Sequence, residues 1–86
     1  MNINELIAIV KNKLQKEIEI QDLKIEDKSF LHKNHKGYQE GKFHLKIIIK
    51  SVELAKTSKI VSTKKIYDIL DLELKKYIHS IQILLN

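Results

Sequence analysis

The chain has 86 residues and a net charge of +5, and it contains no cysteine. A chain of this length forms one domain with a modest core, because it buries only about 60–65% of its unfolded surface. The missing cysteines exclude disulfides, thiolate nucleophiles and thiolate metal ligands supplied by this chain.

The positive charge comes from sixteen lysines and no arginine. A basic balance favours loose attraction to polyanions, but lysine lacks the planar fork with which arginine reads guanine or clamps phosphate. No apolar run approaches the ~20 residues of a membrane span, and the N-terminus lacks the layout of a secretory signal. We therefore expect one cytoplasmic domain over residues 1–86, without membrane contact.

Residues 2–16 are predicted to form a helix, with Asn2 as its N-cap and Glu5 completing a capping box. Apolar residues recur there at helical spacing, at Ile3, Leu6, Ile7, Val10 and Leu14. Residues 23–27 alternate between apolar and charged and predict a first strand. The preceding residues 17–22 either extend this strand or form a connector.

Residues 29–51 hold three of the four histidines, namely His32, His35 and His44. The first part, residues 29–42, is predicted to be a loop that is long for a hairpin, and such loops are usually functional or disordered. The second part, residues 43–51, alternates like a strand with one covered and one largely solvated face. The inward set is Phe43, Leu45, Ile47 and Ile49, and the outward set is His44, Lys46, Ile48 and Lys50.

The remaining elements are predicted as a turn at residues 53–57, a helix capped by Ser58, a separate helix over residues 72–77 capped by Asp71, and a last strand over residues 80–85. The apolar stripe of the Ser58-capped helix is expected at Ile60, Thr63, Tyr67, Leu70 and Leu74, widened by Ile66 and Ile69. The order α-β-β-α-α-β predicts an α+β fold, a two-layer sandwich with helices on one face of a three-stranded sheet. The sequence does not indicate which of the other two strands pairs with the last one.

The order and spacing of several short segments resemble the BolA family. The similarity extends from residue 14 to residue 84, and the matching pieces are Leu23-Lys24-Ile25-Glu26-Asp27-Lys28-Ser29, His32, His35, Gly37, His44-Leu45-Lys46-Ile47, Ser51, Ser58, Ile66-Tyr67, Leu70, Leu74 and Ile78-His79-Ser80-Ile81. That family has a type II KH-like topology, so the resemblance implies the same α+β architecture.

The resemblance also implies a non-enzymatic adaptor that forms a heterodimer with a monothiol glutaredoxin. The two proteins would share a 2Fe–2S cluster in iron–sulfur maturation, trafficking or iron sensing. By position, the implied iron ligands of this chain are His32 and His79, with His35 as the alternative loop ligand. A glutaredoxin cysteine and glutathione would hold the other iron. We expect the isolated chain to carry no cluster and to be a monomer or weak homodimer.

Other interpretations of the histidines remain open. His79 shares its alternation with Ile81 and Ile83, which by itself predicts a histidine in the core or half-buried. His44 is expected to have a structural role across the strands, or else to orient the histidine loop through a hydrogen bond. His32 alone would be an ordinary solvated side chain.

The alternative function is a nucleic-acid-binding transcriptional regulator that uses Lys46, Lys50, Lys64 and Lys65. The family's Arg-His-Arg in the second helix is Ser62-Thr63-Lys64 here, which weakens that alternative. An RNA clamp of the KH type needs Gly-x-x-Gly between helices, whereas the two glycines here are spaced Gly-x-x-x-Gly. The sequence contains neither a Gly-rich phosphate loop nor a nucleophile elbow, so no motif in it indicates an enzyme.

Overall fold

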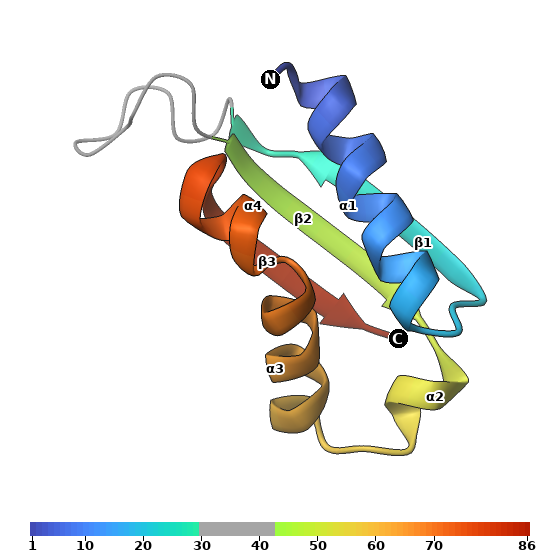
Figure 1. Cartoon of the computed structure of the whole chain (residues 1–86). Helices are drawn as coiled ribbons and strands as arrows, with labels where there is room; N and C mark the ends of the chain where they lie inside the picture. The colour runs from blue at the N-terminus through green and yellow to red at the C-terminus, as the bar shows by residue number, and fades with distance from the viewer. Residues whose placement is uncertain (30–42) are drawn as a thin grey trace.

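The computed structural model describes residues 1–29 and 43–86, so the predicted loop lies almost wholly outside the described residues. The elements follow in the order α1 (Ile3–Glu17), β1 (Asp22–Asp27), β2 (Phe43–Lys50), α2 (Val52–Ala55), α3 (Lys59–Ile69), α4 (Asp71–Lys76) and β3 (Ile78–Leu85). The sheet has the strand order β1-β2-β3; β1 is antiparallel to β2, and β3 is parallel to β2. The helices lie over one face of this open sheet (Figure 1), which confirms the predicted two-layer α+β fold.

The N-terminal helix forms as its sequence predicts. The Asn2 side chain accepts a hydrogen bond from the Glu5 backbone N–H and donates one to the Glu5 carboxylate, both at 2.8 Å. This reciprocal cap satisfies polar groups that the first turn would otherwise leave without intrahelical partners. The helix ends at Glu17, and residues 18–21 are a connector rather than part of β1. None of the helices in the described part of the chain is long and apolar enough to cross a membrane.

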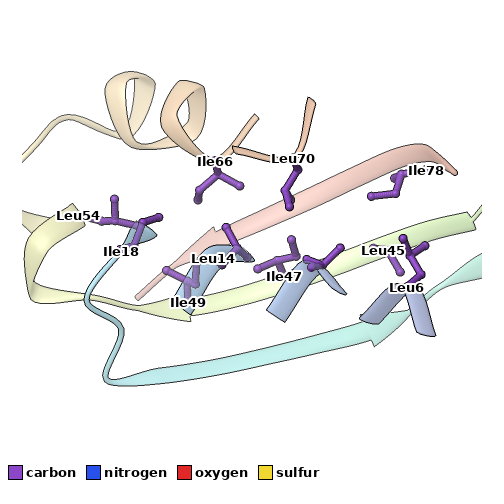
Figure 2. Packing of buried hydrophobic residues seen from close by; sticks show 11 residues of the cluster. Leu6, Leu14, Ile18, Leu45, Ile47, Ile49, Leu54, Ile66, Leu70 and Ile78 are labelled. Carbon is purple, nitrogen blue, oxygen red and sulfur yellow. The ribbon is translucent and has the colours of Figure 1, made fainter. Parts of the chain in front are cut away.

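The hydrophobic core lies between the helices and the inward face of the sheet. Strand β2 is its centre, because Leu45, Ile47 and Ile49 are at most 2% exposed. Figure 2 shows Leu14 of α1 and Ile66 of α3 pointing toward this row from the helical layer. The inward set predicted for β2 is therefore confirmed, with Phe43 partly buried at its end.

The predicted stripe of the helix after Ser58 is wrong at Ile60 and Tyr67, whereas Ile66 and Leu70 are buried as predicted and Ile69 and Leu74 pack against the core. Ile60 is 82% exposed and Tyr67 is 41% exposed, whereas Ser62, Ile66 and Leu70 turn inward. The polar Ser62 can be buried because its hydroxyl donates to the carbonyl oxygen of Leu54 at 3.0 Å and lies 2.7 Å from the Thr57 hydroxyl. A hydrogen-bonded serine inside the core is a tertiary feature that counting apolar residues does not reveal.

Two boundaries also differ from the prediction. Residues 52–55 form the short helix α2 instead of belonging to a turn, because Ser51 leaves the strand and caps it through the Leu54 N–H at 3.1 Å. The break at Asp71 is confirmed, but Leu70 is the N-cap residue of α4 and makes no side-chain cap. Ser58 caps α3 as predicted, accepting from the Val61 N–H.

A partly buried ion pair joins α1 to α4. The Lys13 ammonium group of α1 lies 2.7 and 3.0 Å from the carboxylate oxygens of Glu73 on α4. The Glu73 side chain is 4% exposed and that of Lys13 is 38% exposed. A nearly buried carboxylate without its cation would carry most of its desolvation cost unpaired.

We predict that Lys13→Ala lowers the free energy of unfolding by about 2–3 kcal/mol, because it leaves the Glu73 charge buried alone. The double variant Lys13→Met, Glu73→Leu should lose less, since two apolar groups replace the pair. The control is Lys75→Ala, which breaks the exposed pair between Lys75 and Asp71 and should cost less than ~0.5 kcal/mol. Urea unfolding measures all three, and equal losses for the two lysine variants would contradict the prediction.

Candidate functional site

A register shift between β2 and β3 creates the candidate site. Phe43 pairs with Ile78, but the next residue of β2, His44, pairs with Ser80. Two consecutive residues of β2 thus face three of β3, and His79 is the extra residue of a bulge. From Ser80 onward the pairing advances one residue at a time to Leu85.

The bulge takes His79 away from the core. Ile78 is 2% exposed and points inward, Ile81 packs against the core cluster, and His79 between them is exposed. The expectation of a core or half-buried His79, drawn from simple alternation, is therefore wrong. A signal for the bulge is present in the sequence, because Ile78 and Ile81 are three residues apart and cannot both face inward on an uninterrupted strand.

His44 lies beside His79 and is buried. The two ring centroids are 5.0 Å apart with an interplanar angle of 60°. The His44 Nδ1 atom is 2.6 Å from the Ser80 hydroxyl, so one of these two groups donates to the other. The expected structural contact across the strands is thus present, whereas the expectation that His44 lies on a largely solvated face is wrong, since His44 is only 5% exposed.

Sequence reasoning missed Ser80 as the partner of His44. Their pairing depends on the register shift, since Ser80 would not lie opposite His44 if the strands continued in step from Phe43 and Ile78. The two polar residues that follow Ile78 in the sequence were the available signal.

The loop histidines His32 and His35 lie outside the described residues. The described residues that flank them both attach near His44. The Ser29 hydroxyl accepts the His44 backbone N–H at 3.1 Å, and the Phe43 N–H donates to the Tyr77 carbonyl at 2.9 Å. The two chain segments that enter and leave residues 30–42 therefore join the sheet at the end that carries His79.

An exposed imidazole suits iron at the border of a cluster, so His79 fits the ligand role that the resemblance implied. Within residues 1–29 and 43–86, no group of three or more His, Cys, Asp or Glu side chains is placed to hold a metal ion. His44 is engaged with Ser80 and is better placed to position the neighbouring His79 ring than to bind metal itself.

Comparisons with known proteins agree with this architecture. A family model described as BolA-like protein matches residues 14–86. The DNA-binding transcriptional regulator BolA of Haemophilus influenzae is 33% identical over 73 residues, which cover 85% of this chain and 68% of that protein. The chain belongs to the BolA-like protein family.

Solved structures place the BolA-like chain in the same fold. The BolA domain of SufE1 from Arabidopsis thaliana superposes with a TM-score of 0.79 and 28% identity, covering 100% of this chain and 93% of that chain. BolA1 from Arabidopsis thaliana gives a TM-score of 0.76, also at 28% identity, with coverages of 92% and 87%.

The lysines proposed for nucleic-acid contact lie on opposite layers of the BolA-like chain. Lys46 and Lys50 belong to the sheet face that the helices leave open, whereas Lys64 and Lys65 are exposed on α3 in the helical layer. Lys65 is also paired, at 2.8 Å, with Glu53. The hydrogen bonds from Lys65 and from the Glu19 backbone N–H lower the pKa of Glu53. The two lysine pairs therefore do not form one basic surface.

The open sheet face of the BolA-like chain has a mixed charge near His44. A hollow of about 310 Å³ there is lined by Lys28, His44, Leu45, Lys46, Ser80, Ile81 and Gln82. Glu26 lies 3.7 Å from the Lys28 ammonium group and 3.4 Å from that of Lys24. Desolvation acts to raise the pKa of Glu26, but the surrounding lysines outweigh it and hold the pKa below its usual value.

We predict that Ser80→Ala in the BolA-like chain lowers the free energy of unfolding by about 1 kcal/mol, because buried His44 loses a hydrogen bond. The same substitution should also shift the ¹⁵N resonance of His44 Nδ1. That shift reports the lost contact directly, which a measurement of thermal unfolding does not. The control is Lys50→Ala, exposed on the same sheet face, which should change the free energy by less than ~0.5 kcal/mol. An unmoved Nδ1 resonance in Ser80→Ala would refute the contact.

Proposed function

We propose that this BolA-like chain is a non-enzymatic adaptor that pairs with a monothiol glutaredoxin in the cytoplasm. The pair would share a 2Fe–2S cluster as cargo during iron–sulfur maturation, trafficking or iron sensing. The observation that carries the proposal is the bulge that brings His79 to the surface beside the anchored His44 ring. A histidine sealed in the core would have left this chain without that ligand.

The ligands of this chain would be His79 and one loop histidine, His32 or alternatively His35. The glutaredoxin cysteine and its glutathione would complete the shell of the other iron. Support for a shared site comes from the chain segments on either side of the loop, which join the sheet at the His79 end. Histidine ligation of such a cluster raises its reduction potential relative to ligation by thiolates alone.

The residues around His79 would restrict the orientation of its ring. His44 is held by Ser80 from β3, and its backbone N–H is held by Ser29. The edge of one ring against the other limits the directions in which the exposed imidazole can turn. His44 therefore acts as a positioning residue in this proposal, and the ligand role stays with His79.

Anaerobic mixing with a cluster-loaded monothiol glutaredoxin and glutathione tests the proposal. The native chain should change the visible spectrum of the cluster, and His79→Ala should abolish that change. His79→Cys should restore a bound cluster with a lower reduction potential, because thiolate replaces imidazole. Lys24→Gln, on the far border strand, is the control and should behave like the native chain. A full spectral change with His79→Ala would contradict the assignment.

The name of the Haemophilus relative supports a second candidate function, DNA-binding transcriptional regulation. In this chain the contacts would be made by Lys64 and Lys65 on α3 or by Lys46 and Lys50 on the open sheet face. One duplex cannot use both pairs on a flat contact, because they lie on opposite layers.

Duplex affinity measured by fluorescence anisotropy separates these cases. If phosphate attraction alone acts, binding should be lost by about 200 mM salt. In that case two double variants should lose similar amounts of low-salt duplex affinity. One is Lys64→Gln combined with Lys65→Gln, and the other is Lys46→Gln combined with Lys50→Gln. Binding that persists at high salt and is lost with only one lysine pair would establish a defined DNA surface and favour the regulator.

A further inference from the structure

The two border strands of the sheet differ sharply in charge. The six residues of β1 include Asp22, Lys24, Glu26 and Asp27, whereas the eight residues of β3 contain no lysine, aspartate or glutamate. Both strands have a sheet partner on one side only, among the residues that the structure describes (Figure 1). Charged side chains on a border strand protect it from pairing with other chains, so β1 is protected and β3 is not.

The geometry of β3 is also suited to pairing. The register shift is confined to the start of the strand, and residues 80–85 follow β2 without interruption. The inward residues Ile81, Ile83 and Leu85 stay only partly buried, while the row beside them on β2 is almost fully buried. Leu84, on the open face, is 39% exposed. A further strand alongside β3 would cover this apolar surface and extend the hydrogen-bonded ladder.

We propose that β3 pairs with β3 of a second copy of this chain, antiparallel about a two-fold axis near Gln82. Two identical strands match in length and in the alternation of their side chains, and a two-fold axis brings one surface against itself. The net charge of +5 makes two copies of this chain repel each other overall, whereas β3 faces its own copy without a charged side chain. Backbone pairing along one strand buries little area, so the dimer is weak and depends on concentration.

His79 lies at the start of the same strand, so this pairing places a second chain beside the candidate ligand. The dimer does not require the cluster proposal to be correct, because it rests on the charge and register of β3 alone. Its test accordingly uses the chain by itself.

Sedimentation velocity across a wide concentration range tests the pairing. The native chain should shift from monomer toward twice the monomer mass as its concentration rises. Gln82→Glu should remain monomeric, because two carboxylates then meet near the axis. In the monomer this change is tolerated, since Gln82 is exposed and pairs with Lys46 on β2. Lys24→Gln lowers the net charge by the same amount on the protected border and should dimerise like the native chain.

Gln82→Lys provides the complementary arm. Alone it should also be monomeric, but an equimolar mixture of Gln82→Glu and Gln82→Lys should regain the dimer, because opposite charges then face each other. Circular dichroism of each variant separates loss of pairing from loss of folding. A native chain that stays monomeric at every concentration, or a Gln82→Glu chain that still dimerises, would overturn the proposal. So would a mixture that fails to associate while both variants are folded.

Discussion

The extra residue in β3 is the constraint on which the candidate site depends. At the bulge, three residues of β3 lie opposite two residues of β2. Ile78 and Ile81 therefore both face the core, while His79 is exposed to solvent. The same shift sets Ser80 opposite His44, which anchors the buried ring beside the exposed one. This one change of register keeps Ile78 in the core, leaves the neighbouring His79 exposed, and places the buried His44 ring beside the His79 ring.

Contacts of distant parts of the chain hold this end of the sheet in place. Lys13 of α1 binds Glu73 of α4, whose carbonyl accepts the Tyr77 backbone N–H at 2.8 Å. The Tyr77 carbonyl in turn accepts the N–H of Phe43, at the first pair of the shifted ladder. Glu73 therefore contacts α1 through its side chain and the bulge end of the sheet through its backbone carbonyl. Burial of the Glu73 carboxylate is tolerated because the Lys13 ammonium group contacts both of its oxygens.

Local chemistry predicted much of the fold. The Asn2 cap, the alternation of β2, the Ser58 cap and the break at Asp71 depend on neighbouring residues, and all are visible in the sequence. Periodicity placed Ile66 and Leu70 correctly but not Ser62, because Ser62 is buried through a hydrogen bond to the carbonyl oxygen of Leu54, eight residues away. The exposure of His79 and the burial of His44 depend on pairing between strands more than thirty residues apart, which alternation within one strand does not contain.

The proposed function depends above all on exposed His79 as a ligand of one iron of the shared cluster. Pulsed electron paramagnetic resonance of the reduced cluster tests it most directly, with the histidines of this chain alone labelled with ¹⁵N and the glutaredoxin unlabelled. If His79 is that ligand, ¹⁵N hyperfine couplings from this chain will be observed, and one of them will disappear when His79 alone is replaced. A shared cluster that forms but shows no ¹⁵N coupling, or the same couplings without His79, would contradict it.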